Sequence, residues 1–506
     1  MKIKQTLLLL ILTLSAFSSC SEAKKENKIS ICLWTSPSTF DPRIATDAAS
    51  QRIIENIFNS LVRKDERSNI VPDLALSWTT PNDKTFEFRL RKNIAFHNGE
   101  KFSAHDVKFT YESILDSTFN SPFRAAYGII EEIQVPDSFK VIFKLKKTHA
   151  PFLRDLIRGI VPQSAKENFG QKPIGTGAFQ LKEFIQDSKV TLLANENYFL
   201  GKPKTELVEA RIIKEESTRI LSLETGQIDI LLNNFPEQYF QSFSQNSELK
   251  VTEQTGINYT YLAFNCRNEI LKDSRVRQAI AFAINRPQLL KNLKNNHAKI
   301  AHSLVPESNF YFEPKVSKYD FNLEKASRLL DEAGFEPNEK GQRFTLVYKA
   351  TSSEESRQKA EIIKNYLAKI GINLKIESYE WATFFTDIKK GNFDLCSLTW
   401  VGVADEPDLH HLVFHTESMP PNGANRGSYS NPKLDSLLTL GRTTLDEEKR
   451  KEAYSEAQKI VSEELPYLSL WFDNNILVTQ KDIEGFEIYS GGEWYSLKNV
   501  YRKNEK

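Results

Sequence analysis

The stretch from Phe96 to Tyr111, FHNGEKFSAHDVKFTY, decides the fold of this chain of 506 residues. It predicts the end of a strand, a turn at Asn98, and a helix that begins after Ser103. Ser103 stands three residues before Asp106, so each side chain can accept a hydrogen bond from a free N–H at the helix start. The apolar residues that follow recur at helical spacing: Val107, Tyr111, Ile114 and Leu115.

The first twenty residues have the pattern of an export signal. Lys2 and Lys4 precede an apolar run over 7–14, and small residues lead to Cys20. Such a run is too short to cross a bilayer. The position of Cys20 predicts a lipoprotein signal peptide over 1–20, with Cys20 acylated and residues 21–27 as a polar tether to the membrane. A plain secretory peptide with an incidental cysteine is the alternative.

The composition excludes several classes of protein. The 67 basic and 66 acidic residues nearly cancel, so nothing indicates a nucleic acid or another strongly charged partner. No second apolar run is long enough to span a membrane. Cys32, Cys266 and Cys396 are too few for a disulfide scaffold, and each is expected to be a small buried residue in a strand. A bridge between Cys266 and Cys396 stays open.

The first third of the chain alternates strands and helices. Ile29–Trp34 is expected to form a buried strand, and Asp47 to cap a helix. One face of that helix is expected to carry Ile53, Ile54, Ile57, Phe58, Leu61 and Val62. Strands at Phe86–Leu90 and Val141–Leu145 indicate that residues 66–173 form an α+β lobe of their own.

A second region, from Phe344 onward, predicts a parallel sheet with crossover helices. Its order is a strand at 344–348, a helix at 354–370, a strand at 372–376, a helix at 381–390 and a strand at 393–400. Gly371 and Gly391 stand where a helix end favours positive φ. Helices near 432–440 and 446–464 and a last strand at 468–472 complete the pattern.

The segment F-H-x-G, four residues, A-x-D-V and an aromatic-rich helix closely resembles the signature of the extracytoplasmic solute-binding proteins of family 5. These are the peptide-, nickel- and opine-type receptors of ABC importers. Further blocks resemble the family in the family's order: ICLWTSPSTFDPRIATDAASQRIIENIFNSLVRKD, IVPDLALSW, PIGTGAFQLKEF, YLAFN, RVRQAIAFAINR and YSNPKLDSLL. The resemblance covers nearly the whole chain after the signal.

This resemblance implies an α/β, two-lobed periplasmic-binding-protein fold of the Venus-flytrap type, with an additional inserted α+β lobe. Lobe I would comprise 28–65, 174–266 and 478–506, lobe II the insertion 66–173, and lobe III 267–477. Chain crossings near Tyr259–Cys266 and Ile476–Lys481 would form the hinge. A solute would then bias the lobes toward closure, and a permease would recognise the closed form.

The resemblance also implies the partners. They are a small-molecule or peptide solute, an ABC permease with its ATPase, and the membrane that holds the lipid anchor. We expect a monomer in the bacterial cell envelope, periplasmic or at the cell surface. We expect no cofactor and no contact with nucleic acid.

Enzyme signatures are not expected. His411 and His415 are four apart and close to His410, which suits a metal, but no H-E-x-x-H motif is present. Gly175-Thr176-Gly177 lacks the lysine of a phosphate loop, and we interpret it as a tight turn between lobes. Serine, histidine and aspartate never occur in a G-x-S-x-G setting. We therefore predict no catalytic residues and no resident metal.

The ligand question depends on the segment from Trp400 to Pro407. Peptide-binding members of the family carry an aspartate three residues after a similar tryptophan, and it pairs with the peptide ammonium. This chain has Val403 there, and Asp405 two residues on, which moves the carboxylate roughly 7 Å along a strand. Either Asp405 takes that role or the ligand has no amine there. Ile388 and Ser397 stand where arginines facing a peptide carboxylate are expected.

The other candidate ligand residues come from several places. Trp381 and Trp400 are candidates for an aromatic slot or for the core, and Gly402 follows in the same segment. Asn425 and Arg426 are candidates for an anion site or for turn chemistry. Weaker candidates are Pro37 and Ser38 after the first strand, and Phe123 and Tyr127 in lobe II. A metal chelate, another non-peptide solute, or a sensor or chaperone role is the alternative to a peptide or peptide-like solute.

Overall fold

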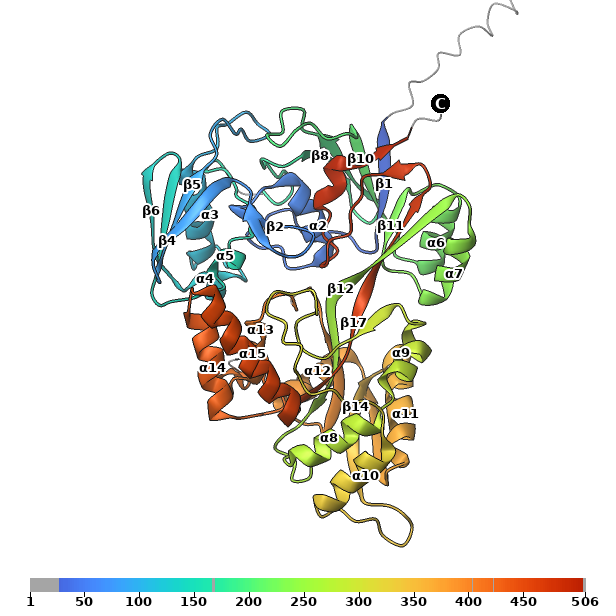
Figure 1. Cartoon of the computed structure of the whole chain (residues 1–506). Helices are drawn as coiled ribbons and strands as arrows, with labels where there is room; N and C mark the ends of the chain where they lie inside the picture. Colours follow the sequence, from blue (N-terminus) through green and yellow to red (C-terminus); the bar gives the residue numbers. More distant parts are fainter. Residues whose placement is uncertain (1–26, 166–168, 403, 422, 504–506) are drawn as a thin grey trace, which may run out of the picture.

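The computed structural model describes residues 27–165, 169–402, 404–421 and 423–503. Cys20, the signal peptide and the tether before Asn27 lie outside this range. Figure 1 shows an upper half built from the first part of the chain together with the C-terminal segment, and a lower half built from most of the later part. Within the described ranges, no helix combines the length and the apolar character needed to cross a bilayer.

A large sheet runs through both halves in the order β15-β14-β16-β12-β17-β11-β1-β10-β9-β8, with β13 also paired to β17. The upper strands are β1 (Lys28–Leu33), β8 (Phe179–Ile185), β9 (Lys189–Ala194), β10 (Leu207–Ile212) and β11 (Ile230–Leu232). The lower strands are β13 (Ala298–Ile300), β14 (Phe344–Thr351), β15 (Ile372–Tyr379) and β16 (Leu395–Trp400). The long strands β12 (Leu249–Phe264) and β17 (Tyr467–Gln480) connect the two sets.

The predicted parallel module is confirmed. β14 pairs in parallel with β15 and with β16, and the helices between them are α11 (Glu354–Ala368) and α12 (Trp381–Lys390). Gly371 and Gly391 have φ of 80° and 73°, the left-handed backbone that suits a glycine at a helix end. The alternation of short apolar strands with helical patterns was sufficient here to predict the module.

The first helix, α2 (Ala48–Ile57), is shorter than its apolar pattern indicates. Asp47 caps it by accepting a hydrogen bond from the N–H of Ser50, as predicted. The helix ends at Ile57, and Phe58 has extended backbone. The prediction that Leu61 and Val62 share its face is therefore wrong: Val62 begins β2 (Val62–Lys64), which pairs with β3 (Ile70–Pro72).

The capped helix of the opening motif is α3 (Ala104–Leu115), and both hydrogen bonds of the Ser103–Asp106 capping box are present. It packs beside a second sheet of order β4-β5-β7-β6. The elements of this region are β4 (Ala75–Asn82), β5 (Thr85–Leu90), β6 (Ile130–Asp137), β7 (Lys140–Leu145), α4 (Arg124–Tyr127) and α5 (Phe152–Asp155). Buried side chains between Leu61 and Ile160 form one core cluster here, in agreement with a separate α+β unit.

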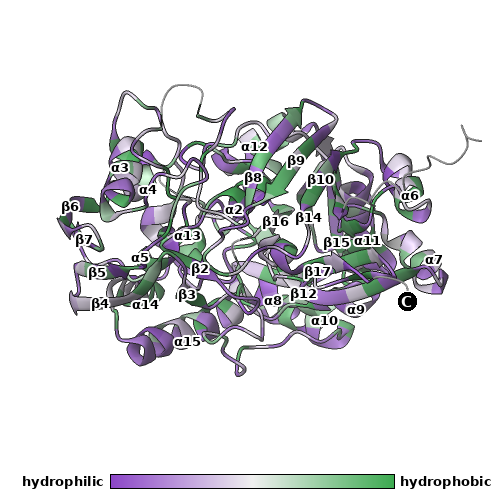
Figure 2. Cartoon of the chain, turned by 90° about the horizontal axis from the view of Figure 1, so that it is seen from above, coloured by the Kyte–Doolittle hydropathy of each residue, from purple (hydrophilic) through white to green (hydrophobic). Residues whose placement is uncertain are grey.

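The remaining helices cover the sheet. They are α6 (Glu216–Glu224), α7 (Phe240–Gln245), α8 (Ser274–Ala283), α9 (Arg286–Lys294), α10 (Leu323–Glu332), α13 (Leu409–Phe414), α14 (Pro432–Thr443) and α15 (Glu447–Glu464). Figure 2 shows α15 at the edge of the molecule with a mainly hydrophilic visible side. Two short strands, β18 (Ile483–Glu484) and β19 (Tyr501–Arg502), pair near the C-terminus.

The two halves are joined by the antiparallel pair β12 and β17. Leu249–Thr255 pairs with Asn474–Gln480, and pairing resumes at Tyr259 opposite Phe472. Between these ladders, the Ile257 N–H donates to the carbonyl of Ser490. The last strand, expected over only 468–472, is thus the lower end of β17. The hinge and the lobe limits stay predictions.

The described cysteines are free thiols. Cys32 and Cys396 are buried, and Cys266 is partly buried. Cys32 lies in β1 and Cys396 in β16, as expected of small apolar residues in strands, whereas Cys266 follows β12.

Candidate functional site

A cavity of about 470 Å³ lies where the upper half meets the lower one. Its walls come from α2 and β2, from the segment 154–159 at the end of α5, from Gly402, and from the loop 489–499 near the C-terminus. The volume is in the range of sites for small organic ligands. Of the ligand residues predicted from the sequence, and within the described part of the chain, only Gly402 lines this cavity.

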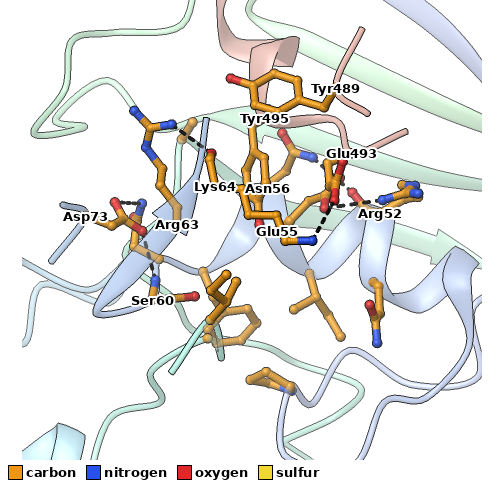
Figure 3. Close-up of a pocket in the computed structure, with 18 of the residues that line it drawn as sticks. Arg52, Glu55, Asn56, Ser60, Arg63, Lys64, Asp73, Tyr489, Glu493 and Tyr495 are labelled. Carbon is orange, nitrogen blue, oxygen red and sulfur yellow. Dashed lines mark hydrogen bonds and ion pairs between the residues drawn. The ribbon is translucent and has the colours of Figure 1, made fainter. Parts of the chain in front are cut away.

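The cavity is lined by many charged side chains, several of which Figure 3 shows. The cations among the described lining residues are Arg52, Arg63, Lys64, Arg154, Arg158 and Lys498, and the acids are Glu55, Asp73 and Glu493. In Figure 3, Arg63 and Asp73 lie on one side, and Arg52, Glu55 and Glu493 on the other. The site therefore has two chemically different ends.

Asp405 is held by two cations of the cavity wall. Its side chain is 1% exposed, its carboxylate lies 3.0 Å from the Lys64 ammonium, and the Arg154 guanidinium donates to the same carboxylate. Burial raises the pKa of Asp405, but Lys64 and Arg154 outweigh burial and keep the pKa below its usual value. The carboxylate is thus ionised and ion-paired within the protein, although its buried Oδ2 has no hydrogen-bond partner among the described residues.

The acidic end contains Glu55 and Glu493. Arg52 lies 3.6 Å from Glu55, Lys64 lies 3.6 Å from Glu493, and the Trp494 N–H donates to Glu55. Burial raises the pKa of Glu55 to about 8; Arg52 opposes this shift and the neighbouring Glu493 adds to it. A carboxyl with this pKa is largely protonated at neutral pH.

The opposite end is organised around Asp73. Its carboxylate accepts hydrogen bonds of 2.9 Å from the Asn59 amide and from the Ser60 N–H. Burial still raises its pKa to about 6. Lys498 is close enough to lower that pKa, and its own pKa is lowered, first by burial and then by Arg63.

The predicted aromatic residues form a separate group in the lower half. The rings of Trp381 and Phe385 stack with centroids 5.2 Å apart. The Arg426 guanidinium lies 5.1 Å from the Phe385 ring and 5.3 Å from the Trp400 ring. Trp381 is 55% exposed, and the buried indole N–H of Trp400 has no hydrogen-bond partner among the described residues. Trp381, Trp400 and Arg426 are therefore brought together around Phe385, outside the cavity lining, and their role as ligand residues stays a prediction.

Other predicted residues have structural partners. Ser38 hydrogen-bonds Asp47 and Ser50 at the start of α2, beside the buried Pro37. Asn425, which is 1% exposed, donates to three backbone carbonyls and accepts from the Tyr429 N–H. These contacts account for Ser38 and Asn425 without a ligand.

The two candidates from the inserted unit differ. Tyr127 is 3% exposed and packs edge-on against Tyr111 in the core. The Phe123 ring lies 3.7 Å from the guanidinium of Arg158, which lines the cavity. Phe123 thus packs against a residue of the cavity wall and does not line the cavity itself. Val403 lies outside the described residues, and the N–H of the neighbouring Gly402 donates to the Asn258 side chain at 3.0 Å.

The histidine cluster is engaged in protein contacts. His411 and His415 stack with centroids 4.2 Å apart. The Arg442 guanidinium lies 3.5 Å from the His411 ring nitrogen, and His415 bonds Thr439 at 3.2 Å. Burial lowers the pKa of His411 to about 4, with Arg442 adding to the shift. A cation next to the ring is an unfavourable setting for a metal ion.

A second cavity, of about 530 Å³, lies beside the opening motif. Its lining comes from the opening motif and the residue before it, and from β8, β9 and the loop that follows β9. The lining residues of the first group are Ala95, Phe96, His97 and Gly99. Its lining contains no residue of the lower half among those described. We therefore place the candidate ligand site in the charged cavity, where the two halves meet.

Sequence reasoning missed most of the charged lining. From the sequence, we place Arg63, Lys64, Glu493 and Lys498 within lobe I and assign none of them a role in binding. One signal was available on α2: Asn56 is polar yet falls among its apolar positions, and it is 3% exposed. A buried polar side chain on an apolar helix face indicates a site or a network.

Comparison with known proteins concerns the family and the fold of this chain. The family model described as "Bacterial extracellular solute-binding proteins, family 5 Middle" matches residues 69–417. The chain is 26% identical over 490 residues to the oligopeptide-binding protein AppA of Bacillus subtilis, covering 91% of this chain and 89% of AppA.

Solved structures are similar over nearly the whole length. NikZ from Campylobacter jejuni, in complex with Ni(L-His), is 26% identical with a TM-score of 0.78, covering 94% of this chain and 100% of NikZ. HbpA2 from Haemophilus parasuis superposes with a TM-score of 0.86 at 24% identity, covering 94% of this chain and 100% of HbpA2. This last likeness concerns the fold.

Proposed function

Because this chain belongs to the bacterial extracellular solute-binding proteins of family 5, we propose that it is the solute receptor of an ABC importer. It captures a peptide or peptide-like solute between its lobes and delivers the solute to a membrane permease. Its task is binding, and no chemical step is assigned to it. The acyl chains on Cys20 hold it at the membrane surface, outside the cytoplasm.

The charged cavity is the observation that carries this proposal. It lies where segments of all three predicted lobes meet: Lys64 from lobe I, Arg154 from lobe II and Gly402 from lobe III. A solute in this position contacts every lobe at once, so it stabilises the closed arrangement relative to the open one. Closure is then the signal that the permease reads.

The crossing strands support the same mechanism. Gly402 is hydrogen-bonded to Asn258 in the interrupted part of β12, and Ile257 is hydrogen-bonded to Ser490, next to the cavity loop. Hydrogen bonds thus join the wall of the cavity directly to β12, one of the two strands that connect the halves. Occupation of the cavity affects the backbone about which the halves rotate.

Native mass spectrometry of the protein purified from its own host tests the proposal. We expect a copurifying small organic solute that is released on denaturation. The Arg63→Gln variant should lose it, whereas Lys272→Gln, whose exposed side chain pairs with Glu269, should keep it. A stoichiometric metal ion without any organic solute, lost in His411→Ala, would contradict the proposal and favour a metal receptor.

A further inference from the structure

The balance of charge in the cavity restricts the solute. With Asp405 included, the described residues contribute six cationic and four acidic side chains. The surplus of positive charge is two when all four acids are ionised, and three when Glu55 is protonated. Arg52, Lys64 and Arg154 are the cations with acidic neighbours at ion-pair distance, and these neighbours are Glu55, Glu493 and Asp405.

The surplus belongs to Arg63, Arg158 and Lys498. Within the described chain, none of the three has a carboxylate within ion-pair distance. Arg63 donates to the Lys64 carbonyl and Arg158 to the Pro42 carbonyl, each at 3.2 Å. The Lys498 ammonium lies over the Tyr198 ring at 5.4 Å.

Two of these cations, Arg158 and Lys498, are in environments that are unfavourable for a charge without a counter-ion. The Nε atom of Arg158 is buried and has no hydrogen-bond acceptor among the described residues. Lys498 is partly buried, and burial together with Arg63 lowers its pKa. Partly buried cations without a counter-charge are unfavourable, and an anionic ligand removes that penalty when it binds.

Asp73 does not neutralise this end. Its carboxylate is already bound by Asn59 and Ser60, and it carries one charge against three. Arginine side chains also present paired N–H donors that match a carboxylate. Cationic walls in a recessed site further concentrate anions from solution.

We infer that the cavity selects a small peptide-like solute of net negative charge, whose carboxylates contact Arg63, Arg158 and Lys498. This inference rests on the proposed function and narrows its substrate class from peptides in general to acidic ones. A neutral solute would leave at least two cationic charges uncompensated in the closed cavity. A basic solute would add to them.

An isosteric pair of dipeptides tests the inference by titration calorimetry. L-Glu-L-Glu should bind at least tenfold more tightly than L-Gln-L-Gln, which has nearly the same shape, and L-Lys-L-Lys should not bind measurably. The preference should fall as salt is raised from low to physiological concentration, because exposed charges are screened over about 8–10 Å.

The Lys498→Gln variant should reduce the preference for L-Glu-L-Glu over L-Gln-L-Gln at least threefold, and the exposed-site control Lys272→Gln should retain it. Equal affinity for the three dipeptides, or no binding of any, overturns the inference. The proposed function is judged separately: it fails if native mass spectrometry finds no organic solute of any charge.

Discussion

The Asp405 carboxylate lies 3.0 Å from the Lys64 ammonium and is buried between that group and Arg154. Residues from three predicted lobes therefore meet in one ion-paired cluster. At the sequence level, Asp405 was a candidate for binding a ligand amine. In the structure, the protein's own cations occupy that carboxylate.

We predict that Asp405→Asn destabilises the protein by about 2–4 kcal/mol, because it removes the carboxylate partner of the partly buried Arg154 and leaves Lys64 paired with Glu493 alone. Urea unfolding measures this change. A double-mutant cycle with Lys64→Met should recover part of the loss. The control Asp187→Asn, which breaks an exposed pair with Lys214, should cost no more than about 1 kcal/mol. Equal effects of the two aspartate variants would contradict the cluster's role.

Glu55 predicts a specific pH dependence. Its pKa is about 8 in the folded chain, above its ordinary value of 4.5, so the folded state binds the extra proton. The associated stability is fully present below about pH 4.5 and is lost as the pH rises toward 8. Glu55→Gln should therefore raise the melting temperature at pH 8 more than at pH 5. A constant difference across this range would contradict the shifted pKa.

The turn that contains Gly175 predicts a large steric effect. A Cβ atom at Gly175 would lie 2.0 Å from the Ile57 carbonyl oxygen, at the end of α2. Gly175→Ala should cost well above 1 kcal/mol by chemical denaturation. Gly226 has φ of 70° but open space around it, so Gly226→Ala should cost only about 1 kcal/mol. A smaller loss at Gly175 than at Gly226 would show that α2 can move away.

The affinity of variants for the copurifying solute shows whether the solute binds in the charged cavity or at the aromatic group around Trp381. Arg63→Gln should weaken binding at least tenfold, equivalent to about 1.4 kcal/mol. Trp381→Ala should change stability by less than about 1 kcal/mol, because the side chain is 55% exposed. A larger loss of affinity in Trp381→Ala than in Arg63→Gln would place the solute beside Trp400 and Arg426.

Local patterns predicted local structure well. The limits of α12, Trp381–Lys390, are those expected, and the caps at Asp47 and Ser103 are present. Each of these depends on residues within a few positions of one another. The same reasoning extended α2 too far, because Leu61 and Val62 are apolar for a different reason: they belong to the core of the second sheet.

The site was predicted less well because its parts are far apart in sequence. Asp405 was predicted as a ligand residue, but in the structure it pairs with Lys64 and Arg154, and no sequence pattern connects these two cations to it. Lys498 and Glu493 enter the cavity from a loop near the C-terminus, and only the folded chain places them beside α2. Trp400 and Arg426 do lie together, with the Arg426 guanidinium 5.3 Å from the Trp400 ring.

The interrupted ladder between β12 and β17 has a mechanical consequence. Both connections between the halves belong to one hydrogen-bonded ribbon, so the halves cannot slide past each other without breaking its ladders. The pairing is interrupted at Gly256–Asn258, and a twist at this point would leave the ladders on either side intact. We therefore predict that the halves move by twisting about this interruption and not by translation.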